Sequence, residues 1–353
     1  MYNNEQNNAL NEKSLMRGIV TKGVGGLYGV RLVCSNAASN VSTADVTCRA
    51  RGHFRHEGMS PLPGDDVLLS ELISPDGKEY VIEDILDRSS DLIRPPMANL
   101  SHLFLLIPSC RPTPDLTVAD KLTAIAEASS IEPVIIVGKS DLDPQRSLEI
   151  EKIYRRAGFN AFRTSAATGE GVEEISNFID RIASEGEKNA RPVRAAFAGV
   201  SGAGKSTLMS ALFPTLELAA GTLSRKTERG RHTTRHVEMF PLKSLSGYEF
   251  YLADTPGFSM IDFTRFNFFG EKELAGNFRE FADCIGQCKY TKCTHTKEEG
   301  CAVLEKLNRG EINPTRHESY IKIFEELKKK PEWKRQKEES AESSAPKRRA
   351  RRR

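Results

Sequence analysis

The residues with the clearest chemistry in this sequence lie between Gly199 and Thr207, in the stretch GVSGAGKST. Its glycines, lysine and serine fit the pattern G-x-x-x-x-G-K-[ST], whose backbone N–H groups wrap around phosphate oxygens. Lys205 would place a positive charge on the outer phosphates, and the Ser206 hydroxyl would ligate Mg²⁺. A chance glycine turn is the alternative. The predicted phosphate-binding residues are Gly199, Val200, Ser201, Gly202, Ala203, Gly204, Lys205, Ser206 and Thr207.

Two later segments could complete a site for magnesium and the terminal phosphate. The sequence DTPG, Asp254 to Gly257, follows an apolar stretch. Its carboxylate could hold Mg²⁺ through water, and the Gly257 N–H could sense the terminal phosphate. Between this segment and the phosphate loop lies GRHTTRH, where Thr233 or Thr234 could enter the magnesium shell. We favour Thr234 as the ligand; an ordinary turn is the alternative.

The stretch VIIVGKSDL, residues 134–142, resembles the Asn-Lys-x-Asp base reader of GTPases, with Gly138, Lys139, Ser140 and Asp141 at its four positions. Asp141 would accept hydrogen bonds from guanine N1 and the exocyclic amine, while the Lys139 stem packs over the ring. Gly138 lacks the side-chain amide that normally ties this loop to the phosphate loop. We therefore expect guanine preference with weaker affinity.

The small residues Ser165 and Ala166, in the sequence TSA, fit the backbone contact to the guanine carbonyl. In Ras-like chains the order is phosphate loop, switch, DTPG, base reader and small-residue loop, but here the last two come first. Joining the usual ends of a domain and cutting it elsewhere leaves every strand in the sheet. The order of the motifs therefore predicts a circularly permuted nucleotide site for GTP or GDP.

The residue after DTPG is Phe258, where Ras-like enzymes place the glutamine that orients the attacking water. A phenylalanine ring cannot orient water by hydrogen bonding, so intrinsic hydrolysis should be slow. The missing group could come from a docked partner or from elsewhere in the chain. His232, in GRHTTRH, is a candidate catalytic group, and a surface histidine is the alternative.

Four of the seven cysteines fall between Cys284 and Cys301, a density that argues for metal before disulfide. Three thiolates and one imidazole satisfy tetrahedral zinc and leave no position for a catalytic water. Free buried thiols are the alternative, and Cys284 is left out because its spacing places it on a preceding helix. The predicted ligands of one structural Zn²⁺ are Cys288, Cys293, His295 and Cys301.

The elements around these motifs predict several domains. Residues 15–94 read as short strands punctuated by glycine, typical of a small antiparallel barrel, and residues 95–268 alternate buried strands with helices, typical of a parallel α/β sheet. Residues 94–100 look like a linker. Residues 1–14 are expected to be disordered, residues 269–330 to form a zinc-binding helical domain, and residues 331–353 to form a charged tail ending in KRRARRR.

One strand of the predicted barrel suggests a partner. In VTCRAR, Val46, Cys48 and Ala50 alternate with Thr47, Arg49 and Arg51, so one face would be apolar and the other basic. His53, Arg55 and His56 follow in the next loop. Small five-stranded barrels often bind RNA on such a face, and a solvated basic face is the alternative.

The chain resembles the RsgA (YjeQ) family, circularly permuted GTPases of late small-subunit maturation. The resemblance covers about residues 15–325 and rests on the motif order, GRHTT, DTPGF, the barrel, and the zinc spacing followed by GCAV. It implies an OB-type barrel, slow GTP hydrolysis stimulated by the small ribosomal subunit, and rRNA contact through both flanking domains. The expected fold is thus an N-terminal OB-type β-barrel, a central permuted α/β P-loop GTPase domain and a C-terminal zinc-binding helical domain.

We therefore expect a cytoplasmic GTPase that binds the small (30S) subunit in its GTP form and leaves after hydrolysis. The partners would be the subunit, its rRNA and other assembly factors, and the chain would be monomeric. A nucleotide-liganded RNA-binding adaptor without significant turnover is the alternative, and a phosphate-loop kinase or ATPase is a second one. No apolar run is long enough to span a bilayer, and the N-terminus lacks the basic flank and apolar segment of a signal peptide.

Overall fold

The computed structural model describes residues 15–33, 44–56, 58–74, 77–92, 95–214, 237–254 and 268–329. The segment expected to be disordered, residues 1–14, and the charged tail lie outside them. The described residues fall into two compact units. One contains residues 15–101, 180–196 and 237–254, and the other contains residues 102–179, 197–214 and 268–329. None of the helices in these ranges combines the length and the apolar character needed to cross a bilayer.

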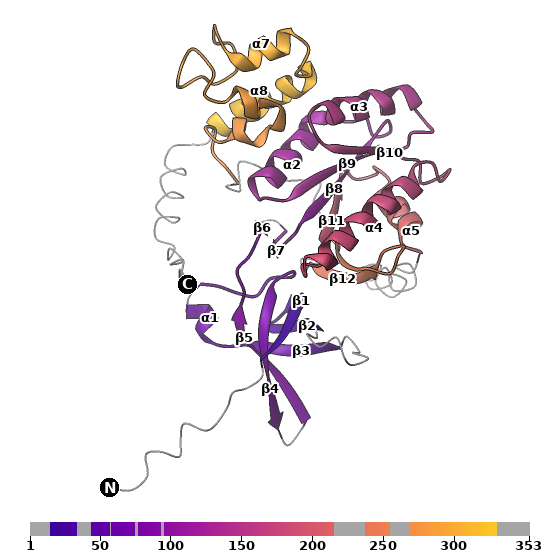
Figure 1. The fold of residues 1–353 in the computed structure, drawn as a ribbon, viewed down its shortest axis with the longest axis vertical. Coiled ribbons are helices and arrows are strands. Elements are labelled where there is room, and N and C mark those ends of the chain that lie inside the picture. The colour runs from indigo at the N-terminus through magenta and orange to yellow at the C-terminus, as the bar shows by residue number, and fades with distance from the viewer. Residues whose placement is uncertain are drawn as a thin grey trace. The chain divides into compact units, whose positions relative to one another are not determined.

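The N-terminal strands of the first unit close into a barrel (Figure 1). The strands pair antiparallel as β1 with β2, β2 with β3, β4 with β5 and β1 with β4, while β3 and β5 run parallel. Because β1 pairs on both sides, the five strands form the OB-like barrel that was predicted. The strands are β1 (Met16–Val24), β2 (Leu27–Val33), β3 (Asp45–Ala50), β4 (Asp66–Ser74) and β5 (Gly77–Ile85).

Alternation along β3 fills the barrel as its sequence predicts. Cys48 is buried, Val46 and Ala50 pack against the barrel core, and Thr47 and Arg49 are exposed. Arg51 is exposed but forms an ion pair with Glu83, in which its Nη2 donates to Oε1 at 2.8 Å. His53–His56 form a short helix, α1, in place of the predicted loop. The basic face therefore exists around Arg49, and one of its two arginines is paired within the barrel.

The first unit also contains β12 (Glu238–Lys243) and β13 (Glu249–Asp254), which pair antiparallel. Strand β1 continues into this pair, because Lys22 lies opposite Glu238 and their side chains form an ion pair at 3.1 Å. β13 runs parallel to the start of β11 (Arg194–Gly199).

The prediction of a linker at residues 94–100 is wrong for residues 95–100, the part that the structure describes. Met97 and Ala98 are fully buried in strand β7 (Met97–Ala98), which pairs with β6 (Asp91–Leu92). Asn99 donates a side-chain hydrogen bond to Gly64 O at 3.0 Å. This stretch is part of the folded unit because its apolar side chains, Met97 and Ala98, are buried in the core.

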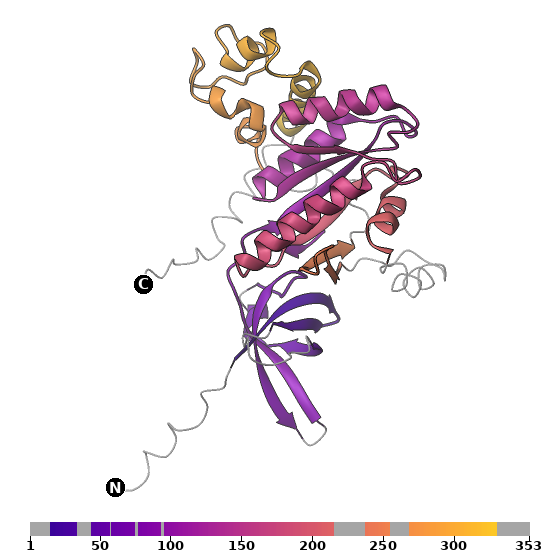
Figure 2. The ribbon, with the colours of Figure 1, turned by 45° about the vertical axis from the view of Figure 1, so that its right-hand side comes forward.

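The second unit is built on the parallel strands β10 (Asn160–Arg163), β9 (Glu132–Gly138) and β8 (His102–Pro108), with the end of β11 beside β8. β8 reads HLFLLIP and β9 reads EPVIIVG, and both are buried along nearly their whole length, as parallel strands covered on both faces must be. Helices α2 (Leu116–Ala128) and α3 (Pro144–Arg156) cover one face, with α5 (Lys205–Leu212) and the start of α4 (Val172–Lys188) on the other (Figures 1 and 2).

Helix starts in this unit follow local capping rules. Asp115 accepts a hydrogen bond from Thr117 N at 2.9 Å at the start of α2, and Asp143 accepts one from Arg146 N at 2.9 Å at the start of α3. Pro144 occupies the first turn of α3, where its missing N–H costs nothing. These caps fix where the loops after β8 and β9 end.

The C-terminal segment packs against α2 in the same unit. It contains the 3₁₀ helices η1 (Leu274–Asn277) and η2 (Arg279–Cys284) and the helices α7 (Ala302–Asn308) and α8 (Pro314–Lys328). Arg316 of α8 is 1% exposed and reaches Asp120 of α2 at 2.5 Å and Glu280 of η2 at 2.6 Å. Its guanidinium lies 4.6 Å from the centroid of the Phe278 ring. One buried arginine therefore joins three elements.

Burial opposes the charged form of Arg316, but the carboxylates of Asp120 and Glu280 outweigh it and raise the pKa of this guanidinium. Tyr154 donates a further hydrogen bond to Asp120 Oδ1 at 2.8 Å. Removal of one partner from such a buried group leaves uncompensated charge, which typically costs about 3–5 kcal/mol. The attachment of the C-terminal segment thus depends on the complete network.

We expect Arg316→Leu to lower the free energy of unfolding by about 3–5 kcal/mol, because Asp120 and Glu280 would remain buried without their cation. Urea unfolding followed by circular dichroism measures the change. Arg309→Ala is the matched control, because Arg309 is 60% exposed and pairs with Glu311, which is 50% exposed. That exposed pair should contribute less than about 1 kcal/mol. Equal losses in the two variants would contradict the role of the buried network.

Candidate nucleotide and metal sites

Loops from three neighbouring strands meet at one edge of the second unit's sheet. β8 and β9 are parallel and in register, with Pro108 opposite Gly138, so the chain leaves both strands at the same edge. β11 lies on the other side of β8 and leads into the predicted phosphate loop. Carboxyl ends of parallel strands are the usual place for ligand sites in such sheets.

The phosphate loop has the backbone that its glycines predict. Gly202 has φ +78° and Gly204 has φ +100°, and Gly204 is the N-cap of α5. A Cβ at Gly199 would lie 2.6 Å from Leu106 O, so only glycine fits where β11 passes β8. Lys205 and Ser206 begin α5, and Ser206 and Thr207 are exposed. The helix N-terminus and the loop thus offer backbone N–H groups to an anion.

The predicted guanine-reading loop is tied directly to the phosphate loop. Lys139 Nζ donates to Gly202 O at 2.9 Å and also to Arg111 O, in the loop after β8. Lys139 itself has φ +60°, the left-handed region that non-glycine residues seldom occupy. Asp141, two residues later, is exposed to solvent. The lysine therefore links three loops, while the carboxylate stays open to a ligand.

The small-residue loop is joined to the same place. Ser140 N donates to Thr164 O at 3.1 Å, and Ser140 Oγ donates to Glu170 Oε2 at 2.8 Å. Ser165 is buried, and its N–H donates to Glu170 O at 2.9 Å, while Ala166 is partly exposed beside it. The structure thus brings residues 138–141, 164–166 and 199–207 together, although they lie far apart in the sequence.

Three residues in this network were missed by sequence reasoning. Ser109 and Arg111 follow β8, and Glu170 follows the TSA segment. None belongs to a motif, and their roles depend on which loops the sheet places side by side. A polar residue directly after a buried strand, as Ser109 is after HLFLLIP, is the only signal that could have pointed to one of them.

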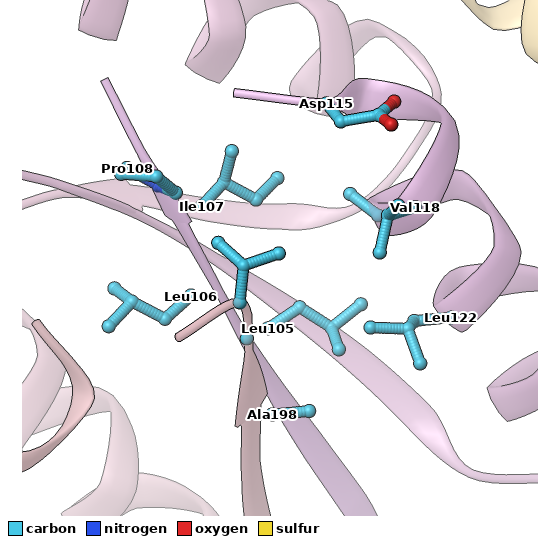
Figure 3. Close-up of a pocket in the computed structure, with 11 residues that line it drawn as sticks. Leu105, Leu106, Ile107, Pro108, Asp115, Val118, Leu122 and Ala198 are labelled. Atoms are coloured by element: carbon cyan, nitrogen blue, oxygen red, sulfur yellow. The ribbon is translucent and has the colours of Figure 1, made fainter. Parts of the chain in front are cut away.

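A small apolar pocket lies beside the phosphate loop, between β8, α2 and the end of β11 (Figure 3). Its volume is about 20 Å³, room for about one water molecule, so it cannot be the nucleotide site. Leu105, Val118 and Leu122 form much of its wall, and Asp115 lies at one side. The pocket is a packing gap next to the site.

Several predicted site residues lie outside the described residues: His232, Thr233, Thr234, Gly257 and Phe258. Asp254 ends β13, and its side chain is not described either. Strand β13 belongs to the first unit and the phosphate loop to the second. The roles predicted for these residues in magnesium binding and hydrolysis stay predictions.

The predicted zinc ligands form one cluster in the C-terminal segment. One donor atom from each of Cys288, Cys293, His295 and Cys301 lies within 4.8 Å of the others. His295 Nδ1 faces the sulfurs of Cys288 and Cys301, each at 3.5 Å, so Nδ1 is the nitrogen that a metal would take. Three sulfurs and one imidazole fit a closed tetrahedral zinc site. Cys284 lies outside this set, as the sequence predicted.

The surroundings hold the cluster from several sides. His317 Nε2 lies 2.8 Å from His295 O, and Tyr320 Oη donates to Thr294 O at 2.9 Å, so α8 fixes the turn that carries His295. Glu298 closes the loop before Cys301. Burial alone would raise the pKa of Glu298, but hydrogen bonds from Thr294 and from nearby backbone N–H groups lower it to about 2. The ionised carboxylate thus acts as a fixed acceptor inside this loop.

Comparison with known protein families gives two matches. The family model described as RsgA GTPase matches residues 85–264, and the model described as RsgA N-terminal domain matches residues 17–78. Two curated relatives are named small ribosomal subunit biogenesis GTPase RsgA. The one from Ruminiclostridium cellulolyticum is 35% identical over 92% of this chain and 97% of its own, and the one from Halalkalibacterium halodurans is 38% identical over 80% and 90%.

Two solved structures have the same fold. YjeQ from Thermotoga maritima superposes with a TM-score of 0.70 at 29% identity, covering 90% of this chain and all of its own. YloQ, described as a circularly permuted GTPase, superposes with a TM-score of 0.67 at 28% identity, covering 90% and 96%. The permuted order of motifs predicted from the sequence agrees with the description of YloQ.

We expect Cys293→Ala to lose the bound zinc, because the three remaining donors leave the tetrahedral set incomplete. Elemental analysis of the purified protein after dialysis measures zinc per chain. Cys284→Ala is the matched control. Cys284 is a buried cysteine of the same segment, whereas Cys293 is half-buried, and Cys284 lies outside the cluster. It should keep about one zinc ion per chain. A full zinc content in Cys293→Ala, or loss in the control, would contradict the ligand assignment.

Proposed function

Because this chain belongs to the RsgA family of GTPases, we propose that it binds and hydrolyses GTP while it assists late maturation of the small ribosomal subunit. The observation that carries the proposal is the hydrogen bond from Lys139 Nζ to Gly202 O, since it joins the guanine-reading loop to the phosphate loop. A kinase or ATPase binds an adenine nucleotide and does not need a loop that recognises guanine. The curated relatives are named GTPases, which favours turnover over a nucleotide-liganded adaptor.

In this proposal the phosphate loop, residues 199–207, holds GTP through its backbone N–H groups, and Lys205 neutralises phosphate charge. Ser206 and Thr234 ligate Mg²⁺, and the segment Asp254–Gly257 completes the site with a carboxylate and a backbone N–H. The glycine conformations at Gly202 and Gly204 support the first of these roles.

Guanine is read at the neighbouring loop. Asp141 accepts hydrogen bonds from guanine N1 and the exocyclic amine, the Lys139 stem packs over the ring, and the backbone of Ser165 and Ala166 contacts the guanine carbonyl. The exposure of Asp141 and its short distance in sequence from Lys139, which contacts the phosphate loop, support this arrangement. With Gly138 in place of asparagine, affinity is lower than in a loop that carries the amide.

Hydrolysis is slow without a partner in this proposal, because Phe258 offers no hydrogen bond to the attacking water. The small ribosomal subunit supplies or orders the missing group, with His232 as the candidate within the chain. The segment after DTPG leads directly into the zinc-binding domain. Loss of the terminal phosphate can therefore reposition that domain and release the protein from the subunit.

Contact with rRNA is proposed for the barrel, residues 15–94, and the zinc-binding domain, residues 269–330, on either side of the GTPase domain, residues 95–268. Arg49 is exposed on the basic barrel face and supports the first contact. The basic tail, within residues 331–353, would add salt-dependent attraction to phosphates. A cytoplasmic monomer that also meets other assembly factors is consistent with this role.

We expect purified small ribosomal subunits to raise the rate of GTP hydrolysis at least tenfold, equal to about 1.4 kcal/mol off the barrier. Phosphate release with and without subunits measures the effect. Lys205→Ala should stay folded but lose both the basal and the stimulated rate. A wild-type rate that subunits leave unchanged would argue against the ribosomal partner, and an active, well-folded Lys205→Ala would argue against the phosphate loop.

We expect Asp141→Asn to shift the base preference from guanine toward xanthine, because the amide donates where the carboxylate accepted. Competition binding with GTP, xanthosine triphosphate and ATP measures the preference, with Asp143→Asn as the control. Asp143 lies two residues away and accepts from Arg146 N as the cap of α3, so its change should not alter the ranking of nucleotides. An unchanged preference in Asp141→Asn would falsify the assignment of the base reader.

A further inference from the structure

Ser109, the first residue after β8, holds the start of the guanine-reading loop at two points. Its hydroxyl donates to Lys139 O at 2.6 Å, and its backbone N–H donates to Gly138 O at 2.9 Å. Ser109 is 2% exposed, so both of its donor groups are buried. One residue of a neighbouring loop thus fixes two successive peptide groups of the base reader.

The backbone that Ser109 holds is unusual. Lys139 has φ +60°, a conformation that a side chain with a Cβ seldom adopts and that persists only when its surroundings determine it. This conformation accompanies the reach of Lys139 Nζ to Gly202 O and Arg111 O. Asp141 follows two residues later, so the direction of its carboxylate depends on the same turn.

Gly138 explains why this support matters in this chain. A side-chain amide at position 138 would normally tie the loop to the phosphate loop, and glycine cannot. A Cβ built at Gly138 would lie 3.5 Å from Ala203 O, in the phosphate loop, and 3.0 Å from Leu106 Cδ1. A side chain at position 138 would therefore lie next to the phosphate loop, but glycine has no side chain that could bind this loop.

We propose that Ser109 is a positioning residue for guanine recognition, taking over part of the tie that an asparagine at 138 would supply. This inference rests on the proposed function, since it requires that Asp141 binds guanine. The Oγ bond to Lys139 O keeps the left-handed turn in place, and the turn sets where Asp141 meets the base. Ser109 itself does not touch the nucleotide.

A purely structural role for Ser109 makes a different prediction. A buried hydroxyl that only satisfies a carbonyl would, when removed, lower stability and weaken every nucleotide alike. A positioning residue would instead weaken the contacts made by Asp141. Inosine nucleotides separate the two cases, because hypoxanthine keeps N1–H and the carbonyl of guanine but lacks the exocyclic amine that Asp141 binds.

The test measures dissociation constants of GDP, IDP and ADP for the full-length protein by competition with a fluorescent guanine nucleotide. Loss of one neutral hydrogen bond corresponds to as much as about tenfold in an equilibrium constant. We expect Ser109→Ala to weaken GDP by about five- to tenfold and IDP by less than about threefold. Ser109→Cys, which fills the site with a somewhat larger group that donates only weakly, should change selectivity in the same direction and guards against misfolding of the alanine variant.

Gly138→Asn in the Ser109→Ala background should recover at least half of the lost GDP affinity, because its amide can reach Ala203 O. Gly138→Ala in the same background is the control, since it adds the Cβ without the amide and should recover none. Unchanged binding in both Ser109 variants, an equal loss of GDP and IDP, or equal effects of asparagine and alanine at 138 would overturn the proposal. If wild-type protein binds ADP as well as GDP, the proposed function fails instead.

Discussion

The parallel register of β8 and β9 is the constraint on which the nucleotide site depends. It sets Pro108 opposite Gly138, so the loops after the two strands begin side by side. β11 on the other side of β8 adds the phosphate loop at the same edge. Contacts such as Lys139 to Gly202 then form whatever the order of the strands along the chain. A circular permutation changes which strand comes first and leaves this edge intact.

The sequence predicts features that depend on local pattern or on motif spacing. The alternation of Val46, Cys48 and Ala50 located the barrel face, and the cysteine spacing located the metal cluster. The contacts of Ser109, Glu170 and Arg316 could not be predicted in this way, because each contact joins segments far apart in the sequence. Strand register and helix packing determine which residues they contact, and these cannot be inferred from a single sequence. The linker prediction fails for residues 95–100 because Met97 and Ala98 are buried in a strand that pairs with β6, a contact that the local sequence does not reveal.

The buried network around Arg316 makes the cysteine-bearing segment part of the nucleotide-binding unit. Asp120 lies on α2, which begins just after the loop whose Arg111 O accepts from Lys139. The same helix is therefore held at its start by the site and along its length by α8 and η2. Breaking the Arg316 contacts would strand two buried carboxylates, so α2 and the C-terminal segment should move together in any displacement of that loop. The loop after β8, helix α2 and the C-terminal segment thus form one contiguous set of contacts.

Guanine selectivity and nucleotide affinity depend on different atoms of this site. Both purines present N7 as an acceptor, so an amide directed at N7 adds binding energy without distinguishing guanine from adenine. In the proposed site Asp141 accepts from N1–H and from the amine on C2 of guanine, and adenine has neither group, so Asp141 would carry the discrimination. Replacement of the amide by Gly138 is tolerable for selectivity as long as other contacts keep Asp141 in place. Lys139 on Gly202, Ser140 on Thr164 and Ser109 on Lys139 are those contacts. In the proposed site the loop can thus lose the side chain at its first position and still recognise guanine.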